Sequence, residues 1–404
     1  MTWRTTRLKY LAAVPITNGL GEAAQDSDPA WPRYIRTTDI ASPRNLHADR
    51  RVSLPPEVGR RSMVQTGDLL MCAAGSLGKV YLHQDGEPAC YAGYLVRFRP
   101  RLDVVDPRFV AYWAESQPFL DQISVGAVRS TIDNFSAGKY QQMDLSLPSL
   151  DEQRRIADFL DGETARIDQL IQLRERQAEA VTTRLDAHAA SAITGVNGTP
   201  LPMRRVMARW IDYRGATPTK STSGVRLITA SNIKHGEITF AQSEEFIPEE
   251  DYDAWMRRGL PEQGDVLLTT EAPLGETAQI EATDVGLAQR IILLRTDPSR
   301  CLPRWLYWWL RSPLGRAALR AHATGSTAPG IKADRLRAIP LPVPDLQAQA
   351  RVIQELDRSQ VITLKVMPLL ARQVALLHER RMSLITAAVT GELNVAAAAG
   401  GAAC

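Results

Sequence analysis

An internal repeat dominates this sequence of 404 residues, because segments of its first half return about 196 residues later. Residues 107–113 (PRFVAYW) return as residues 303–309 (PRWLYWW), and residues 145–195 return as residues 341–391, each copy ending in Thr-Gly. Further matched pairs are residues 34–40 with 227–233 and residues 67–70 with 264–267. Solenoid repeats recur roughly every 20–50 residues, so this much longer period indicates a duplicated domain.

The two copies keep a constant spacing only in part. From residue 107 to residue 195 the offset to the second copy stays at about 196 residues, whereas upstream it varies between about 193 and 197. Outside the shared motifs the two modules differ at most positions. Two similar but diverged modules on one chain favour bivalent recognition of a pseudo-symmetric partner, for which duplex DNA is the obvious candidate.

Each copy is predicted to form a mixed, largely β module that ends in a helix. Short segments rich in β-branched or aromatic residues and separated by Gly and Pro are typical of strands. The predicted strands are residues 34–40, 68–71, 80–83 and 94–98 in the first copy and 227–233, 265–269 and 290–294 in the second. Residues 107–123 and 304–319 carry apolar side chains at helical spacing near a proline, so we predict one helix in each.

A long amphipathic helix is predicted behind each module. Between residues 152 and 193 apolar side chains recur every three or four residues, and the pattern returns after residue 352. A helix of about 40 residues spans roughly 60 Å and cannot bury its apolar stripe alone, so its repeat is the natural partner. A two-fold relation between the repeats makes this pair antiparallel. Gly162 could interrupt the first helix, and Pro368 should kink the second.

Together these patterns predict an α+β fold in which two similar mixed α/β domains are joined by two long antiparallel helices. The predicted modules are residues 1–147 and 197–343, the helices are 148–196 and 344–393, and residues 394–404 form a disordered tail. The tail is predicted to be disordered because this segment has low complexity and consists mostly of Ala and Gly.

Composition limits the class of protein. The net charge of +3 and the pI of about 8.7 fall short of the strongly basic footprint of a compact nucleic-acid-binding domain. If the chain binds DNA, its basic residues must be concentrated on certain surfaces, or a partner must supply much of the positive charge. The four cysteines form no CxxC pair, so we expect neither disulfides nor structural zinc. We find no signal peptide and no apolar run near the roughly 20 residues of a membrane-spanning helix, and expect a cytoplasmic protein that binds no membrane.

No motif in the chain predicts catalysis. The loop at residues 75–79 lacks the full glycine and hydroxyl pattern of a P-loop and is typical of a hairpin turn. Asp68 and Asp265 follow glycine at equivalent strand starts, and no Asp-x-Lys or Glu-x-Lys occurs in the chain. They are therefore predicted to cap turns rather than to hold a catalytic metal. The six histidines lack metal-ligand spacing, so we expect no catalytic residue, metal or cofactor in this chain.

Two polar, basic loops are candidates for DNA contacts. Residues 126–139 (GAVRSTIDNFSAGK) and 325–337 (GSTAPGIKADRLR) follow the module helix in the two copies. Their short hydrogen-bonding side chains and cations suit phosphates and base edges, although a solvated connector would have a similar composition. The candidate DNA-binding residues are Arg129, Ser130, Asn134, Lys139, Lys220, Ser326, Thr327, Lys332 and Arg335.

Five segments carry a resemblance to a known family. They are residues 34–40 (YIRTTDI), 67–70 (GDLL), 147–156 (LPSLDEQRRI), 325–327 (GST) and 336–342 (LRAIPLP). In this order, and with a long helix behind each module, they resemble the specificity subunit of type I restriction–modification systems. The resemblance covers nearly the whole chain, and the helix entry at residues 147–156 is its strongest part.

The resemblance implies two target recognition domains, each reading one half of a bipartite DNA site. The paired helices would hold them apart and dock two modification (methyltransferase) subunits, and restriction subunits with translocase and nuclease activity would join this phage-defence complex. S-adenosylmethionine, ATP and Mg would then belong to the partners. The residues expected to dock partners are Gln153, Arg155, Ile156, Gln349, Arg351 and Val352. The second copy lacks counterparts of Glu152 and Arg154, so the two docking sites are expected to differ in affinity.

Three alternatives remain open from the sequence. The same architecture could serve another restriction class, in which enzyme and specificity chains are arranged differently. The chain could be a self-contained nuclease or methyltransferase, which turnover by the purified chain would reveal. It could also be a coiled-coil scaffold whose β modules bind protein, which steeply salt-dependent DNA binding would argue against.

Overall fold

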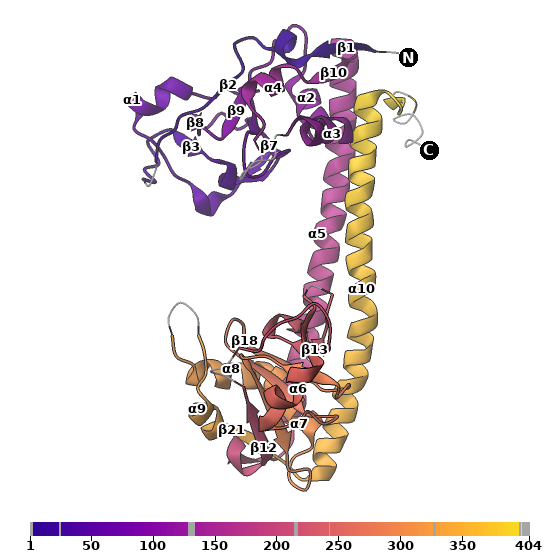
Figure 1. Cartoon of the computed structure of the whole chain (residues 1–404). Helices are drawn as coiled ribbons and strands as arrows, with labels where there is room; N and C mark the ends of the chain where they lie inside the picture. The colour runs from indigo at the N-terminus through magenta and orange to yellow at the C-terminus, as the bar shows by residue number, and fades with distance from the viewer. Residues whose placement is uncertain are drawn as a thin grey trace. The chain divides into compact units, whose positions relative to one another are not determined.

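The computed structural model describes residues 3–23, 26–127, 134–213, 217–241, 243–325, 329–395 and 397. Its contacts divide the chain into two compact units. Unit 1 comprises Met1–Arg174 and Arg372–Cys404, and unit 2 comprises Glu175–Ala371. Each unit therefore holds one module together with one end of each long helix (Figure 1).

The module of unit 1 is built on a four-stranded antiparallel sheet in the order β2-β9-β6-β7. Its strands are β2 (Thr17–Asn18), β6 (Leu69–Cys72), β7 (Val80–Leu82) and β9 (Leu95–Phe98). A separate parallel pair consists of β3 (Arg33–Ile35) and β8 (Ala89–Tyr91). The strand β1 (Arg4–Arg7) pairs with β10 (Asp144–Leu147), which precedes the long helix.

The module of unit 2 repeats this plan with longer strands. Its four-stranded sheet has the order β12-β20-β17-β18, and a three-stranded sheet has the order β16-β13-β19. The strands are β11 (Thr199–Pro202), β12 (Met207–Asp212), β13 (Val225–Ile228), β16 (Glu245–Ile247), β17 (Val266–Thr270), β18 (Leu274–Gln279), β19 (Val285–Leu287), β20 (Ile291–Thr296) and β21 (Pro340–Val343). As in unit 1, the strand that opens the module pairs with the one before the long helix, here β11 with β21.

The strand predictions are largely confirmed. Residues 68–71, 80–83, 94–98, 265–269 and 290–294 correspond to β6, β7, β9, β17 and β20, and β6 and β7 form the hairpin expected around residues 75–79. Residues 34–40 and 227–233 are strands only in part. A 3₁₀ turn follows each first strand, η2 (Thr37–Asp39) or η6 (Ala230–Asn232). A side chain in each turn bonds the backbone locally, which competes with a strand ladder.

The prediction of one continuous helix at the end of each module is wrong. Residues 107–123 form α2 (Pro107–Trp113) and α3 (Gln117–Gly126), and residues 304–319 form α7 (Pro303–Arg311) and α8 (Pro313–His322). Pro118 and Pro313 lie at the starts of the second helices. Because proline lacks an amide hydrogen and crowds the preceding turn, it begins a helix more easily than it continues one.

The two long helices are confirmed as α5 (Leu150–Thr194) and α10 (Leu346–Thr390). Gly162 does not interrupt α5, because it lies on an exposed face where the cost of glycine is only about 1 kcal/mol. Pro368 likewise lies inside α10 without ending it.

Each unit shows that the long helices are antiparallel. In unit 1, Leu160 near the start of α5 shares a core with Ile385 near the end of α10. In unit 2, Ile193 at the end of α5 shares a core with Val352 at the start of α10. Both cores continue into the module sheet and its helices, so the helix ends are integral parts of the modules rather than separate spacers.

The end of the chain corrects one expectation. Val395, placed in a disordered tail by the sequence, is 3% exposed and packs in the unit 1 core with Leu8. Trp3 also packs on this core, beside Gly391, whose φ of 82° follows the end of α10. Ala396 and residues 398–404 lie outside the described residues. The first and the last described parts of the chain thus meet in unit 1.

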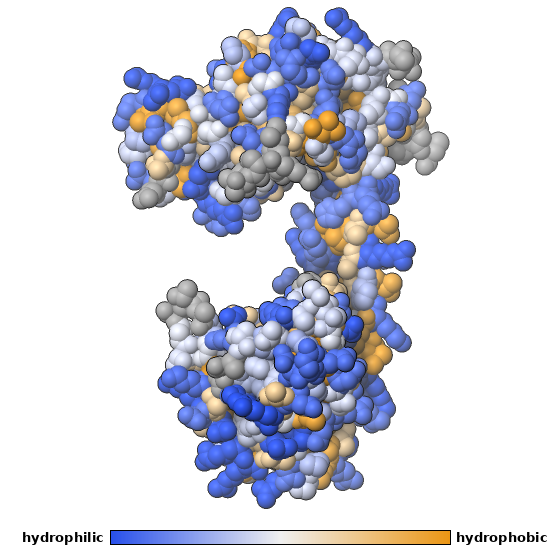
Figure 2. All heavy atoms as spheres, in the orientation of Figure 1, coloured by the Kyte–Doolittle hydropathy of each residue, from blue (hydrophilic) through white to orange (hydrophobic). Residues whose placement is uncertain are grey.

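The middle of α10 differs from the expectation that the chain has no apolar run near the length of a membrane-spanning helix. An 18-residue window of this helix has a mean hydropathy of 1.3 and at most two charged residues, which is long and apolar enough to cross a membrane by composition alone. Only 6% of the window is buried. In unit 2 its exposed apolar side chains include Val361, Ile362 and Leu369. Figure 2 shows hydrophobic residues on the surface of the long helices. Exposed apolar strips of this kind are uncommon on monomeric soluble proteins.

Candidate nucleic-acid interface

A groove lies at the same place in each module. In unit 1 it has a volume of about 570 Å³ and lies between η2 and the turn at residues 92–94. In unit 2 it has a volume of about 330 Å³ and lies between η6 and the turn at residues 288–290. These turns are related by the repeat offset of about 196 residues, and each leads into an inner strand of the four-stranded sheet. The duplication therefore places equivalent grooves in the two modules.

A buried side chain fixes the 3₁₀ turn beside each groove. Asp39 accepts a hydrogen bond from the Arg36 amide (2.9 Å) and two from its guanidinium (3.0 and 2.7 Å). Its counterpart Asn232 accepts a hydrogen bond from the Thr229 amide (2.8 Å) and donates to two backbone carbonyls. Because Asp39 and Asn232 are both buried, the turn has a defined conformation while its neighbours remain available to a ligand.

The side chains that line the two grooves differ in chemistry. In unit 1, Tyr94 is 68% exposed and lies with Thr38 on the groove. In unit 2, the position matching Tyr94 holds Arg290, and Lys220 and Ser231 line the same groove. Aromatic faces stack on bases, while arginine and lysine contact phosphates or guanine edges. The same framework therefore offers two different recognition surfaces.

The cations of the unit 2 groove are paired with two carboxylates, of which Glu271 is exposed and Glu245 is half-buried. Arg290 Nε lies 3.3 Å from Glu271 Oε1, and Lys220 Nζ lies 2.7 Å from Glu245 Oε2. The exposed pair of Arg290 and Glu271 contributes about 0–1 kcal/mol, so a polyanion can compete for Arg290. Lys220 was among the sequence candidates, whereas Arg290 was missed. The repeat could have identified Arg290, because this residue occupies the position that matches the exposed Tyr94 of the first copy.

A buried glutamine joins each module to its long helix. In unit 1, Gln153 of α5 accepts a hydrogen bond from the amide of Asp106 (2.9 Å) and donates to the carbonyls of Val104 and Pro148. In unit 2, Gln349 of α10 bonds the three backbone groups at the repeated positions, at 2.8 to 2.9 Å. Both glutamines are 0% exposed, so they fix the helix entry to the loop before the module helix.

A carboxylate on α5 provides a second joint in unit 1. Asp161 accepts hydrogen bonds from Arg108 (2.8 Å) and Tyr112 (2.7 Å), both on α2. Burial raises the pKa of Tyr112, because the phenolate would lose its hydration. The hydroxyl therefore stays protonated and serves as a donor.

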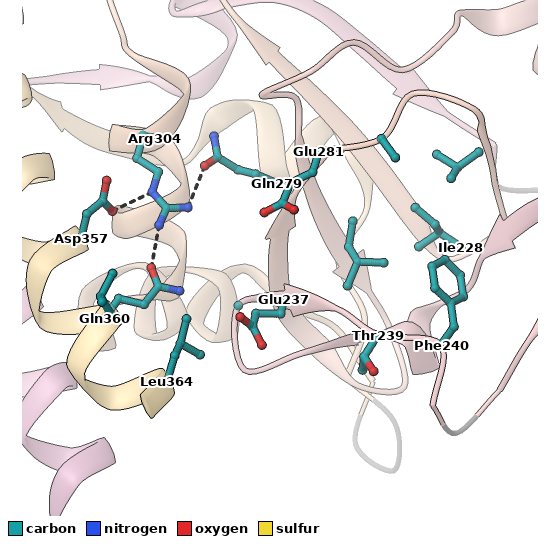
Figure 3. A pocket seen from close by; sticks show the side chains of 15 residues that line it. Ile228, Glu237, Thr239, Phe240, Gln279, Glu281, Arg304, Asp357, Gln360 and Leu364 are labelled. Atoms are coloured by element: carbon teal, nitrogen blue, oxygen red, sulfur yellow. Dashed lines mark hydrogen bonds and ion pairs between the residues drawn. The ribbon is translucent and has the colours of Figure 1, made fainter. Parts of the chain in front are cut away.

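Unit 2 repeats this joint on α10. Asp357 accepts hydrogen bonds from Arg304 (2.7 Å) and from the indole of Trp308 (2.8 Å), both on α7. Arg304 also donates to Gln279 at the end of β18 and to Gln360 of α10, at 2.8 and 2.6 Å (Figure 3). One arginine thus connects the sheet, the module helix and the long helix. These joints were not recognised in the sequence, although each pair of positions keeps the repeat offset.

Comparison with solved structures identifies the fold. No protein-family model matches the chain. The fold is similar to that of a chain from a structural study of the assembly and conformational transition of a type I restriction–modification system, with a TM-score of 0.71. The alignment covers 97% of this chain and 98% of that chain at 15% identity. At this identity the likeness concerns the fold alone.

Two curated proteins are similar to this chain in sequence. The type I restriction enzyme EcoBI specificity subunit of Escherichia coli is 21% identical over 338 residues, which cover 76% of this chain and 70% of that protein. The type I restriction enzyme StySPI specificity subunit of Salmonella potsdam is 22% identical over 273 residues, which cover 63% of this chain and 58% of that protein. The chain is a homologue of type I specificity subunits.

In this specificity-subunit homologue, the loop residues expected to contact DNA fall into three groups. Arg129, Ser130, Ser326 and Thr327 lie outside the described residues. Lys332 and Arg335 are exposed on and beside α9 (Ala333–Ala338), which leaves them accessible to a ligand. Asn134 and Lys139 border the loop of unit 1. Asn134 forms a β-bridge with Ala74 in the β6–β7 hairpin, and Lys139 Nζ donates to the carbonyl of Gly126 (2.6 Å), so Lys139 is bonded to the end of α3.

The residues expected to dock partner subunits separate by burial. Gln153, Ile156, Gln349 and Val352 are each at most 5% exposed and pack within the modules of this specificity-subunit homologue. Their placement on a partner surface is therefore corrected, because the module itself covers the start of each long helix. Arg155 and Arg351 are exposed, and Arg155 forms an ion pair with Glu152 one helical turn earlier.

The turn-capping role expected for Asp68 and Asp265 is confirmed. Asp68 accepts a hydrogen bond from the amide of Gln65 (2.8 Å) and forms a two-pronged ion pair with Arg99. Asp265 repeats this geometry with the amide of Glu262 (2.7 Å) and with Arg295.

Burial raises the pKa of the Cys72 and Cys301 thiols, to about 11 and about 12, which leaves them protonated at neutral pH. Among the described residues no group of three His, Cys, Asp or Glu could hold a metal.

Proposed function

We propose that this chain is the DNA sequence-specificity subunit of a type I restriction–modification complex. Each module reads one half of a bipartite, asymmetric DNA site through the groove beside η2 or η6 and the loops beside α4 (Ala137–Gln141) and α9. The observation that carries the proposal is that equivalent grooves on a duplicated framework hold different exposed side chains, Tyr94 in one and Arg290 in the other. A shared framework with diverged contacts suits two different half-sites.

The chain itself is proposed to be non-catalytic and cytoplasmic. Two modification subunits would bind exposed apolar side chains of the long helices, which include Val361 and Ile362 in unit 2 and Leu173 in unit 1. Restriction subunits would join this core. S-adenosylmethionine, ATP and Mg would be bound by those partners. Because the net charge of this chain is only +3, the partners would also supply much of the positive charge needed to bind DNA.

Exchange of one module tests the proposal. Replacing residues 1–145 by those of a relative with another target, in the assembled complex, should change one half of the methylated sequence and leave the other half as it was. Sequencing of methylated bases in a host genome gives the readout. Exchange of residues 197–341 is the matched control and should change only the other half. A change in both halves, or in neither, after a single exchange would contradict two independent readers.

Substitution of Arg290 tests the groove itself. Arg290→Ala should weaken binding of the assembled complex to its target duplex by roughly 10- to 100-fold, the range for a lost contact to a base edge, and should relax specificity in one half-site. Arg300→Ala is the control, since Arg300 is exposed in the same unit and pairs with Asp297 away from the groove. Titration of target and scrambled duplexes at one salt concentration measures both effects. Equal weakening for both duplexes would assign Arg290 to phosphate contacts instead.

A further inference from the structure

The end of β17 joins the groove of unit 2 to the polar loop of the same module. The amide of Thr270, the last residue of β17, donates to the carbonyl of Arg290 (2.9 Å), and the carbonyl of Thr270 accepts a hydrogen bond from the amide of Ile331 (3.0 Å). The next residue, Glu271, forms a β-bridge with Gly330. The turn that carries Arg290 and the loop that precedes α9 are therefore both bonded to one short segment.

The same backbone bonds recur in unit 1. The amide of Ala73, which follows β6, donates to the carbonyl of Tyr94 (2.8 Å), and the carbonyl of Ala73 accepts a hydrogen bond from the amide of Phe135 (2.8 Å). The next residue, Ala74, forms a β-bridge with Asn134. Since these residues lie at the repeat offset from those of unit 2, the two copies share one backbone framework at this point.

Two positions of this framework change together between the copies. Where unit 1 has Ala74 and Tyr94, unit 2 has Glu271 and Arg290. Arg290 Nε lies 3.3 Å from Glu271 Oε1, and the two side chains are 51% and 50% exposed. The framework of unit 1 forms without either charge, so the ion pair of unit 2 is not required to hold the framework and is accessible to a ligand.

The donors and acceptors of this ion pair match the major-groove edge of a G·C base pair. Guanine presents two acceptors, N7 and O6, and cytosine presents the N4 amino group as a donor. Because the contact to Glu271 runs through Nε, the Nη1 and Nη2 groups of Arg290 remain available for the two guanine acceptors. The carboxylate of Glu271 is an acceptor for the amino group of cytosine. A DNA phosphate offers acceptors only and has the same sign of charge as Glu271, so it matches the pair less well.

We propose that Glu271 and Arg290 together read one G·C base pair in the half-site that unit 2 recognises. Arg290 donates to N7 and O6 of the guanine, and Glu271 accepts a hydrogen bond from the amino group of the cytosine. Glu271 is thereby a specificity-determining residue, because it adds a contact at the correct base pair and repels the phosphate backbone at other sequences. The inference rests on the proposed function, since it needs unit 2 to bind duplex DNA.

Removal of the carboxylate tests the role of Glu271. In the assembled complex, Glu271→Ala should bind the target duplex more weakly and a scrambled duplex more tightly, so that the ratio of the two affinities falls roughly tenfold. The framework accepts alanine here, since unit 1 has Ala74 at this position. The control is Glu281→Ala, which removes an exposed carboxylate of the same unit that does not line the groove. Titrations at one salt concentration give the affinities, and thermal melting checks folding. An unchanged ratio in Glu271→Ala, or an equal fall in the control, would overturn the proposal.

Modified bases identify the base pair that is read. Each G·C pair of the half-site that exchange of residues 197–341 alters is replaced in turn, once with 7-deazaguanine, which lacks N7, and once with 2-pyrimidinone, which lacks the amino group of cytosine. At one pair both replacements should weaken binding of the native complex by roughly three- to tenfold. The 2-pyrimidinone effect should disappear in Glu271→Ala, and the 7-deazaguanine effect should disappear in Arg290→Ala.

The outcomes separate this inference from the proposed function. A half-site in which no G·C pair responds to both bases, or responses that persist in the two variants, would overturn the joint reading by Glu271 and Arg290. In that case the native complex still prefers its target to a scrambled duplex. Failure of the proposed function instead leaves no sequence preference that depends on this chain.

Discussion

Replacement of Gln349 by alanine is expected to lower the free energy of unfolding by about 3–5 kcal/mol. The substitution leaves the amide of Leu302 and the carbonyls of Arg300 and Pro344 without their partner. Each unsatisfied buried polar group costs about 1–3 kcal/mol. Gln153→Ala should have a similar effect in unit 1, because its side chain makes the same three bonds. Urea denaturation followed by circular dichroism measures the change.

The matched controls for these substitutions lie on the same helices. Gln354→Ala on α10 and Gln172→Ala on α5 change exposed glutamines and should alter stability by only a few tenths of a kcal/mol, since alanine and glutamine have similar helix propensities. Gln349→Glu keeps the size of the side chain but removes both donated hydrogen bonds, so it should also destabilise strongly. If Gln349→Ala were as stable as its control, the glutamine would not be an anchor of the module.

Deletion of one heptad from both long helices is expected to shorten the spacer between the two DNA half-sites by about three base pairs. Removing residues 173–179 from α5 and 369–375 from α10 keeps the apolar stripes in phase and takes about 10 Å out of each helix. About 10 Å corresponds to roughly three base pairs of duplex at 3.4 Å per pair. Methylation mapping of the assembled complex reports the spacer directly.

The control for the deletion keeps helix length and changes sequence. Replacing the same residues by others that retain the apolar positions should leave the spacer as in the native chain. Both half-site sequences should be unchanged in either variant, because the grooves lie outside the altered segments. A native spacer after the deletion would exclude the long helices as the element that sets it.

Helices and strands with a strong apolar periodicity, or with glycine or proline at their ends, could be predicted from the sequence. Contacts between distant segments of the chain could not. The repeat located α5 and α10 and the central strands, because apolar spacing is a local property of the chain. The family resemblance places Gln153 and Gln349 on a partner surface, whereas the structure buries both side chains. The hydrogen-bond partners of Gln153 are backbone groups of residues that lie 47, 49 and five positions earlier in the chain. No periodic pattern in the sequence encodes such pairing.

The candidate recognition surface was only partly predictable. Lys220 was selected for its charge, but Tyr94 and Arg290 lie where the repeat offset begins to vary and where no motif marks a loop as functional. Comparison of the two copies at those positions would have exposed the difference, since a framework position that changes from tyrosine to arginine is under no packing constraint. Three-dimensional structure was needed to place both residues in equivalent grooves.

Unit 1 is completed by parts of the chain that lie far apart in the sequence, and this affects how the chain folds during synthesis. Its core joins Leu8 to Ile385 and Val395, whereas unit 2 is one continuous segment, Glu175–Ala371. A ribosome therefore delivers the whole of the second module before the first has received its last helix. Until then the nascent first module exposes the apolar flank that α10 will cover, and exposed apolar surface on an incomplete module favours aggregation.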